Sequence, residues 1–520
     1  MARPLSRRTM LGAGAWVAAT VTGGVALTAR GGDGPAAAGQ AGQFGPAGQL
    51  GTGHRGPAGH LGHGGLNVVT VANRAPATSP FSVPLPVPPV LAPSSTTSDT
   101  DTYDITSRAG QEELLPGHPA EVLGYNGTYI GPTIRARVGR RVVVRHRNEL
   151  TKDTAVHLHG AHTLAASDGF PTDVIAPGAA RAYEYPNEQP ATTLWYHDHA
   201  HHNESEHIYR GLHGFYLLED PAEASLGLPS GDFDIPVMLS DATFDADGQL
   251  VYALLDEAGR TTLLTNGRPA PYFEVQARKY RFRLLNAANM RIFDLVLGRN
   301  EEFTQIAGDG GLLPVPARVR ALRLSPAERV DIVIDFSRYQ PGTQLQLTNT
   351  RNLLDPAAPV SQPVLRFDVV AATGTDTSRV PTTLTSLPAL APATRVRDVV
   401  LAFDTVAYSF VLNGKVFDPN RVDFRIRRGT TEIWRITNPV VPVAVYHNLH
   451  LHLVQFRVLD RNGAPPGPGE SGWKDTVLLA PGETVRVQAT FSEYLGKFVY
   501  HCHAVDHASI GMMAVFETYA

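Results

Sequence analysis

The stretch that decides the fold runs from residue 481 to residue 503 and reads PGETVRVQATFSEYLGKFVYHCH. It begins with a Pro-Gly turn, continues in alternating apolar and polar residues, and ends in a His-Cys-His triplet. Alternation with period two is typical of a β-strand that has one buried face. The stretch therefore predicts neighbouring strands of an antiparallel sheet, with metal-binding side chains at the end of the last one.

The same plan occurs twice more in the chain. Residues 177–199 read PGAARAYEYPNEQPATTLWYHDH, and residues 326–348 read PAERVDIVIDFSRYQPGTQLQLT. In each copy 20 residues separate the Pro from the aligned position, which is His197, Gln346 or His501. An Asn-Gly turn precedes each copy, at residues 126–127, 266–267 and 413–414. The repeat predicts an all-β protein of three consecutive Greek-key β-sandwich or barrel domains.

Composition limits the function. The chain has 520 residues, of which 43% are hydrophobic and 18% charged, with a formal net charge of −4. This balance can bury several cores, and the lack of a basic excess argues against a nucleic-acid partner. Cys502 is the single cysteine, which excludes an intrachain disulfide.

The N-terminal residues predict an export signal rather than a folded domain. Residues 6–11 read SRRTML, a twin-arginine pattern, and an apolar run rich in Gly and Ala follows up to Ala29. We expect residues 1–38 to be a twin-arginine export signal, with a periplasmic, cell-surface or extracellular destination. A membrane anchor is the alternative, because the run is long enough to span a bilayer. Its glycines and threonines make a weak anchor, so stable membrane insertion is not expected.

A linker and three domains are predicted to follow. Residues 39–79 are dominated by Gly, Ala, Pro and Gln, a composition that favours disorder. A loose metal-binding tract is the alternative for its three histidines, His54, His60 and His63. The expected domain boundaries are 80–225, 226–395 and 396–520.

Half of the 20 histidines fall in four short clusters near the ends of predicted strands. The clusters are His157-Leu158-His159, His197-Asp198-His199, His447 with His450 and His452, and His501-Cys502-His503 with His507. Residues i and i+2 of a strand share a face, so each His-x-His pair presents two imidazoles side by side. The same alternation directs Cys502 away from its two histidine neighbours. One segment can thus contact two separate metal sites.

The ligand types favour copper. A Cys thiolate with two His and a weak axial Met is the ligand set of a blue-copper electron-transfer centre. Cys502, His507 and Met512 supply three of these ligands locally, and His447 is the natural fourth. The remaining eight histidines make four pairs, enough for a cluster of three copper ions. No histidine lies between His213 and His447, so the middle unit is predicted to be a spacer without copper.

These motifs resemble the three-domain multicopper oxidases, which consist of three cupredoxin domains. The resemblance is strongest to the branch of spore-coat laccases and bilirubin oxidases, and it extends from about residue 80 to the C-terminus. It rests on the four clusters and on Gly472-Trp473-Lys474-Asp475-Thr476, Arg278–Arg283 and Ser325–Arg329. It implies four coppers per chain: one of type 1, one of type 2 and a type 3 pair.

The resemblance also implies a ligand set. Type 1 copper would be held by His447, Cys502, His507 and axial Met512, and type 2 copper by His157 and His450. One type 3 ion would take His159, His197 and His503, and the other His199, His452 and His501. Single electrons would enter at type 1 copper and pass through Cys502, His501 and His503 to the cluster, where four of them reduce dioxygen to two waters.

Asp168 matches an acidic position that assists proton delivery in this branch, and a turn residue is the alternative because Ser167-Asp168-Gly169 is good turn sequence. Spore-coat laccases also carry an acidic residue directly after the second type 1 histidine, where this chain has Ala508. We expect His201, His202 and His207 to lie at the surface or behind the ligands. His118, His146, His162 and His213 have no partner at metal-binding spacing.

The donor is the least determined property. The main expectation is a monomeric oxidase of phenols, aminophenols and related electron-rich aromatics, with dioxygen as acceptor. Bilirubin oxidation and oxidation of Cu(I) or Mn(II) remain alternatives, although six methionines and no Met-rich insert disfavour Cu(I). A non-enzymatic copper-resistance protein would not need a complete cluster beside a type 1 site. A copper nitrite reductase has two domains and a simpler set of histidines.

Overall fold

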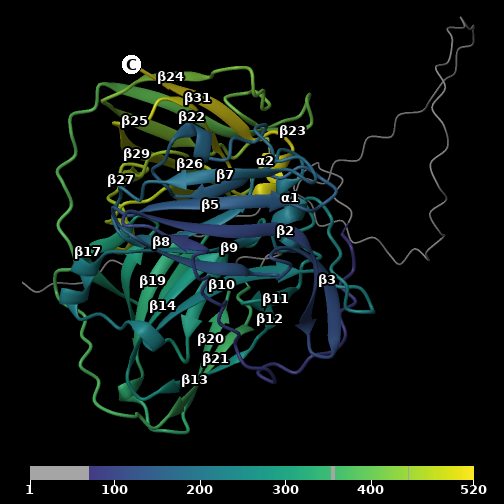
Figure 1. Ribbon diagram of the computed structural model, residues 1–520, viewed down its shortest axis with the longest axis vertical. Coiled ribbons are helices and arrows are strands. Elements are labelled where there is room, and N and C mark those ends of the chain that lie inside the picture. Colours follow the sequence, from purple (N-terminus) through teal and green to yellow (C-terminus); the bar gives the residue numbers. More distant parts are fainter. Residues whose placement is uncertain (1–69, 353–357, 443) are drawn as a thin grey trace, which may run out of the picture. The chain divides into compact units, whose positions relative to one another are not determined.

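The computed structural model describes residues 70–352, 358–442 and 444–520. The predicted export signal and the three histidines of the predicted linker lie outside the described residues. Strands dominate the described chain, and they form two sheets in each of three successive stretches (Figure 1). We call these stretches the N-terminal, middle and C-terminal sandwiches.

The N-terminal sandwich has sheet orders β1-β2-β5-β7, with β3 on β2, and β4-β9-β8-β6. Its strands are β1 (Ser95–Thr96), β2 (Thr100–Leu115), β3 (His118–Tyr125), β4 (Gly131–Arg137), β5 (Arg141–Asn148), β6 (Val156–His159), β7 (Ala180–Tyr185), β8 (Thr192–Asp198) and β9 (His213–Glu219).

The middle sandwich has sheet orders β12-β11-β10-β14-β19-β16-β17 and β13-β21-β20-β15-β18. Its strands are β10 (Asp234–Ala242), β11 (Thr262–Thr265), β12 (Arg268–Pro269), β13 (Tyr272–Gln276), β14 (Lys279–Asn286), β15 (Phe293–Leu297), β16 (Phe303–Gly308), β17 (Gly311–Val319), β18 (Ala321–Leu324), β19 (Arg329–Asp335), β20 (Gln344–Asn349) and β21 (Gln362–Val370).

The C-terminal sandwich has sheet orders β23-β22-β25-β29-β27 and β24-β31-β30-β26-β28. Its strands are β22 (Arg395–Asp404), β23 (Ser409–Leu412), β24 (Phe424–Arg427), β25 (Thr430–Thr437), β26 (His447–Leu451), β27 (Phe456–Arg461), β28 (Thr476–Leu479), β29 (Thr484–Phe491), β30 (Gly496–His501) and β31 (Met513–Tyr519).

Helices are short in the described part of the chain. The two α-helices are α1 (Glu204–Arg210) and α2 (Val505–Ser509), and the 3₁₀ turns are η1 (Ala165–Ser167), η2 (Pro221–Leu226), η3 (Gly231–Phe233), η4 (Phe336–Arg338) and η5 (Pro468–Glu470). None of these helices has the length and apolar character needed to cross a membrane.

The three predicted Asn-Gly turns are confirmed, because both residues of each turn have positive φ. The φ angles are 59° and 78° at residues 126 and 127, 46° and 76° at 266 and 267, and 52° and 71° at 413 and 414. Two successive positive φ angles define a type I′ turn, whose twist matches that of paired strands. Asn and Gly tolerate this conformation better than other residues, so the residues at each of the three turns favour the conformation found there.

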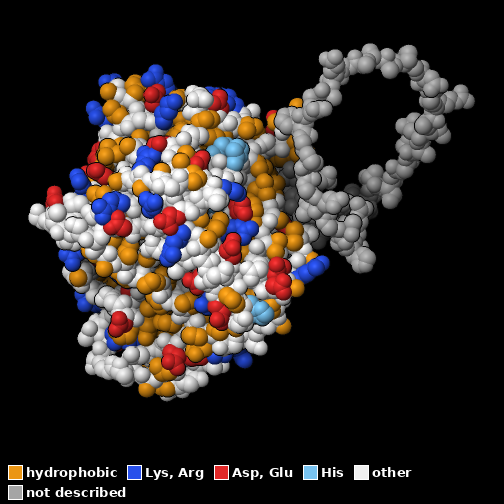
Figure 2. All heavy atoms as spheres, turned by 45° about the vertical axis from the view of Figure 1, so that its right-hand side comes forward, with side chains coloured by type: hydrophobic (Ala, Val, Ile, Leu, Met, Phe, Trp, Pro, Cys, Tyr) orange, Lys and Arg blue, Asp and Glu red, His pale blue; other side chains and the backbone are white. Residues whose placement is uncertain are grey.

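Each sandwich has its own core between its two sheets. Large buried side chains include Tyr183 in the N-terminal core, Phe282 in the middle core and Trp434 in the C-terminal core. Charged side chains of both signs are interspersed over the face shown in Figure 2, where histidine occupies only small areas. Three consecutive cupredoxin-like sandwiches are thus the fold that the repeat predicts.

Contacts with the middle sandwich begin before the predicted domain boundary at residue 80. The backbone N–H of Val71 donates to Asp256 Oδ2 at 2.7 Å, and that of Arg74 donates to the Phe244 carbonyl at 2.8 Å. The last ten residues of the predicted linker therefore include a segment that packs against folded structure. The remaining boundaries stay predictions.

Candidate metal centres

Four strands, two from each outer sandwich, carry the histidine clusters or end directly before them. Strands β6 and β8 pair antiparallel with His157 opposite His197, and β26 and β30 pair with His450 opposite His501. Every residue of β6, β8 and β26 is buried. A strand buried on both faces can present imidazoles to a protein interior instead of to water.

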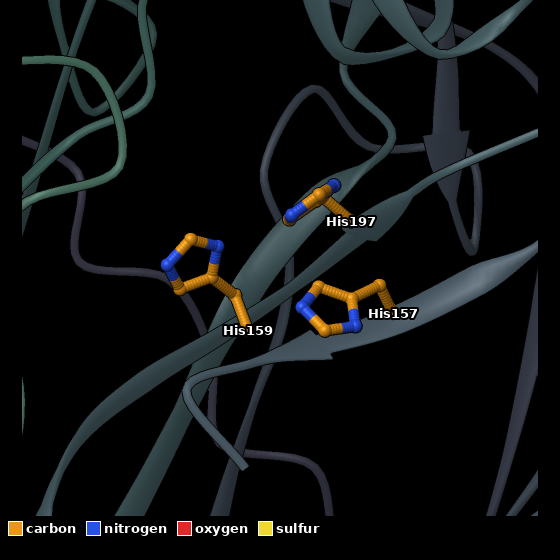
Figure 3. Close-up of side chains that lie close together, drawn as sticks. All are labelled: His157, His159 and His197. Atoms are coloured by element: carbon orange, nitrogen blue, oxygen red, sulfur yellow. The ribbon is translucent and has the colours of Figure 1, made fainter. Parts of the chain in front are cut away.

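The strand pairs bring eight histidines of the two outer sandwiches into one cluster. These are His157, His159, His197, His199, His450, His452, His501 and His503. The Nε2 atom of His501 lies 3.2 Å from that of His199 and 3.2 Å from that of His452. The rings of His157 and His452 stack at 3.8 Å, and those of His159 and His450 stack at 3.7 Å. Figure 3 shows three of the eight, His157 and His159 on β6 and His197 on β8, with their rings directed toward one another.

The ligand groups correspond only partly to the predicted grouping. His199, His452 and His501 hold their ligand atoms within 4.8 Å of one another, as expected for one type 3 ion. His159 and His197 form such a group with His157. His503, the expected third member, lies against both, with its ring centroid 4.9 Å from His159 and 5.2 Å from His197.

Unpaired nitrogen atoms show that the cluster fits metal ions. Among the described residues, buried nitrogens without a hydrogen-bond partner include His159 Nδ1, His197 Nε2, His199 Nδ1 and both ring nitrogens of His503. Burial lowers the pKa of all eight imidazoles, to about 3 for His197 and about 4 for His450. A neutral imidazole offers the lone pair that a metal needs, and an ion would satisfy atoms that are otherwise costly to bury.

A second site lies on the other side of Cys502. The Cys502 Sγ atom is 3.7 Å from His447 Nδ1 and 3.7 Å from His507 Nδ1, and all three residues are buried. Burial raises the pKa of the Cys502 thiol to about 12. The thiolate that a blue-copper site needs therefore requires a bound cation in place of the proton.

Met512 belongs to the same site by its backbone position. Its carbonyl accepts from the Cys502 N–H at 3.1 Å, and its own N–H donates to the His507 carbonyl at 3.0 Å. The side chain is fully buried. The ring of Phe410 lies against His507, tilted by 32° with the ring centroids 3.9 Å apart, which limits the positions open to that imidazole.

Asn448 is a residue of this site that the sequence did not single out. Its Oδ1 accepts from the backbone N–H of His503 at 2.7 Å and of Ala504 at 3.0 Å, and lies 3.6 Å from Cys502 Sγ. It ties the ligand loop after β30 to strand β26. The available signal was its place between two predicted ligands, His447 and His450.

Asp168 lies against the eight-histidine cluster, directly after η1. Its Oδ2 accepts from His452 Nδ1 at 2.8 Å, and its backbone carbonyl accepts from His157 Nδ1 at 2.6 Å. Burial raises the pKa of this carboxyl to about 8. It therefore orients two imidazoles, which is more than a turn residue does.

Asp475 is the second carboxylate at the cluster. It belongs to the Gly472–Thr476 motif, and no role was predicted for it. Its Oδ1 lies 3.0 Å from His159 Nε2, and its carbonyl accepts from His450 Nδ1 at 2.9 Å. Burial alone would raise the pKa of the Asp475 carboxyl, but the Arg329 guanidinium, helped by His450 and the Thr476 hydroxyl, holds the pKa below its usual value.

The histidines outside the predicted ligand set make other contacts. His207 Nδ1 donates to Asp198 Oδ2 at 2.9 Å, behind the ligands of β8, and His202 Nδ1 donates to the Ser509 carbonyl at 3.1 Å. The ring of His201 lies against that of His202, with the centroids 3.8 Å apart. His213 and His162 each donate to a backbone carbonyl, and His146 is buried among tyrosine rings.

Fold and sites together define a copper protein built from cupredoxin-like sandwiches. The multicopper oxidase family models match residues 107–223 and residues 389–520. A laccase of Bacillus subtilis (strain 168) is 35% identical in an alignment 502 residues long. The match covers 82% of this chain and 96% of the relative. A bilirubin oxidase of Albifimbria verrucaria is 37% identical, with coverage of 86% and 82%.

Solved structures agree with these relatives. A laccase from Pediococcus acidilactici superposes with a TM-score of 0.78 at 32% identity, covering 86% of this chain and 95% of that one. The McoA multicopper oxidase of Aquifex aeolicus gives 0.76 at 30% identity, covering 85% and 100%. The chain belongs to the multicopper oxidase family. It is a copper-dependent oxidoreductase with dioxygen as acceptor, and the family's copper complement is one type 1, one type 2 and two type 3 ions.

Proposed function

We propose that this chain is a laccase-type oxidase of small, electron-rich aromatic donors such as phenols and aminophenols. The observation that carries the proposal is the pairing of two sites on one triplet: Cys502 faces His447 and His507, while His501 faces His199 and His452. Bound at these sites, copper supplies one-electron oxidation of donors and four-electron reduction of dioxygen. Four donors each lose one electron, and one dioxygen takes up four electrons and four protons to give two waters.

We propose that the ligand roles follow the family pattern. We assign His447, Cys502, His507 and Met512 to type 1 copper, and His157 and His450 to type 2 copper. The type 3 pair takes His159, His197 and His503, and His199, His452 and His501. The bonds from Cys502 to His501 and His503 make the shortest covalent connection between the two sites, which suits electron transfer.

Asp168 is the proton-handling group of this proposal. A carboxyl with a pKa of about 8 holds its proton at neutral pH and can release it nearby. Its Oδ2 accepts a hydrogen bond from His452, a proposed cluster ligand, so a proton that leaves the carboxyl starts next to the cluster. Ala508 offers no such group after His507, which leaves Asp168 as the carboxyl that the family pattern supplies.

The methionines support an aromatic donor over Cu(I). Thioether sulfur is the soft ligand that a Cu(I)-binding surface uses. The four methionines of the described residues, Met238, Met290, Met512 and Met513, are all buried. Bilirubin and Mn(II) remain alternative donors, and one relative is named for bilirubin.

Export by the twin-arginine route remains part of the proposal. It rests on the Arg7-Arg8 pattern and the apolar run up to Ala29. That route carries folded proteins, which suits a chain that must retain its copper.

Dioxygen uptake by the copper-loaded protein tests the activity. The donors are a methoxyphenol, an aminophenol, bilirubin, Cu(I) and Mn(II), each with the wild type and with Cys502→Ser. Ser509→Ala is the matched control, because it changes a buried residue of α2 whose hydroxyl has no hydrogen-bond partner in the described structure. We expect uptake with the phenols in wild type and Ser509→Ala, and none in Cys502→Ser. A fully copper-loaded protein without uptake for any donor would instead be a copper-binding protein.

A further inference from the structure

Two arginines of the middle sandwich are completely buried and reach the C-terminal sandwich. Arg260 and Arg329 are each about 1% exposed or less. Arg260 pairs with Asp506 at 2.8 Å, and Arg329 pairs with Asp475 at 2.5 Å. Each of these aspartates lies beside one of the two candidate copper sites, although the middle sandwich has no histidine of its own.

Every N–H group of Arg329 is used. Its Nε donates to the Thr193 carbonyl at 2.9 Å, in the N-terminal sandwich, and its Nη atoms donate to the carbonyls of Ala327 and Asp309. Both Nη atoms also donate to Asp475, at 2.7 Å and 2.5 Å. The planar fork holds both carboxylate oxygens in one orientation, a geometry that a lysine cannot reproduce. One guanidinium thereby joins all three sandwiches.

Asp475 transmits this orientation to the eight-histidine cluster. Its Oδ1 is the acceptor for His159 Nε2, while His159 Nδ1 has no hydrogen-bond partner in the described structure. A carboxylate that accepts from one ring nitrogen fixes the tautomer and turns the other nitrogen toward a metal. The Asp475 carbonyl does the same for His450 through Nδ1, leaving Nε2 on the cluster side, 3.4 Å from His157 Nε2.

Arg260 contacts the carboxylate beside the Cys502 site through one nitrogen, Nη2, while its Nε and Nη1 have no hydrogen-bond partner in the described structure. Asp506 directly precedes His507 on α2, and it is fully buried. Its carboxylate accepts from Arg260 Nη2, from Asn289 Nδ2 at 3.0 Å and from the Leu255 N–H at 2.7 Å, all in the middle sandwich. The Ser205 hydroxyl of α1 donates to it as well. These bonds fix the five-residue helix α2, and with it the position of His507.

We propose that the histidine-free middle sandwich positions both copper sites, through Arg329 and Asp475 at the eight-histidine cluster and through Arg260 and Asp506 at the Cys502 site. Its role then goes beyond that of a spacer. The inference rests on the proposed ligand assignment. Arg260 and Arg329 are positioning residues, because each acts through an aspartate and touches no ligand in the contacts above.

A purely structural role would look different in a matched variant. Arg397 and Glu432 form a buried ion pair inside the C-terminal sandwich, 8% and 4% exposed, with the same two-pronged geometry. Arg397 also donates to the Arg425 carbonyl. Its loss should cost stability in the same way as loss of the other two arginines, without affecting either copper site.

The test compares Arg329→Lys, Arg260→Lys and Arg397→Lys as copper-loaded proteins. Visible absorption and the reduction potential report on type 1 copper, electron paramagnetic resonance on type 2 copper, and total copper and thermal unfolding are measured in parallel. Arg329→Lys should change the type 2 signal and weaken copper retention about 10- to 100-fold with the visible band unchanged. Arg260→Lys should shift the visible band or the potential with the type 2 signal unchanged. Arg397→Lys should lower the unfolding temperature alone.

The proposal is overturned if Arg329→Lys and Arg260→Lys lower the unfolding temperature as Arg397→Lys does and leave both spectra as in wild type. It is also overturned if Arg329→Lys changes the type 1 band and Arg260→Lys changes the type 2 signal. Where a lysine variant does not fold, Asp475→Asn and Asp506→Asn decide in its place, because they keep side-chain size and remove the carboxylate. A wild type without a type 1 band or type 2 signal would contradict the proposed function instead.

Discussion

Strands β8 and β30 of the outer sandwiches and strand β20 of the middle sandwich hold the same position in the repeat. The aligned residues are His197 in β8, His501 in β30 and Gln346 in β20. His197 and His501 are each 2% exposed and lie in the shared cluster. Gln346 is exposed, on a strand whose burial alternates, and its neighbour across the sheet is Arg366 of β21.

The difference shows what the repeat does and does not provide. A cupredoxin-like strand of this kind places side chains i and i+2 on one face in all three copies. In the outer sandwiches that face lies against a histidine-bearing face of the other, and in the middle sandwich it meets water. A metal site therefore requires two such faces in contact as well as the right residues on a strand.

The largest expected effect comes from giving β30 the residue found in β20. His501→Gln should lower dioxygen uptake by at least about 100-fold, because loss of a residue that only supports a ligand already costs 10- to 100-fold. The visible band of type 1 copper should persist, since Cys502 faces the other site. Uptake and visible absorption of the copper-loaded variant check this. Dioxygen uptake equal to that of the wild type would show that His501 is not a ligand of the cluster.

Asp168→Asn sharpens the comparison within the N-terminal sandwich. The substitution keeps the size of the side chain and removes its acid, so turnover should fall by about 100-fold while copper content stays normal. Steady-state turnover with a phenol and total copper are the measurements. If turnover is unchanged at full copper, Asp168 is only a turn and orienting residue.

A buried histidine outside the cluster tests how much burial alone contributes. Burial lowers the pKa of His146, on β5, to about 3, against about 6.5 in the unfolded chain. Between these values the unfolded state binds one more proton at His146, so this residue by itself costs the wild type about 1.4 kcal/mol of unfolding free energy for each pH unit below 6.5. His146→Phe should lack this loss.

Chemical unfolding of both copper-free proteins at pH 7, 6, 5 and 4 measures the effect. The variant should gain stability relative to wild type as the pH falls. Parallel stability curves would show that His146 is protonated in the folded protein. Oxidase activity of the copper-loaded variant serves as the control and should stay normal.

The smallest effect is expected from making the middle sandwich look like its neighbours. The double variant Gln346→His and Thr348→His places a His-x-His pair on β20, where no histidine-bearing strand faces it. Copper content should stay at the wild-type value, and stability should change by no more than about 0.5 kcal/mol. Tightly bound additional copper would mean that the pair alone suffices, against the comparison above.

The sequence by itself determined the local part of this protein. Side chains of a strand alternate between faces, so residue spacing predicted the three-fold repeat and the pairing of imidazoles on shared faces, and Asn-Gly pairs predicted the turns. The same period of two separated Cys502 from His501, and the structure places them in different sites. The predicted ligands from His157 to His507 needed no knowledge of the packing.

Only the tertiary structure decided which faces meet. His157 stacks on His452, and Asp168 contacts the same residue from 284 positions away. The Arg329–Asp475 and Arg260–Asp506 pairs span 146 and 246 positions, and no local pattern marks them. Burying the charge of Arg329 depends on acceptors that other parts of the chain supply for each of its N–H groups. Those acceptors come from separate sandwiches, and their arrangement is a property of the packed chain.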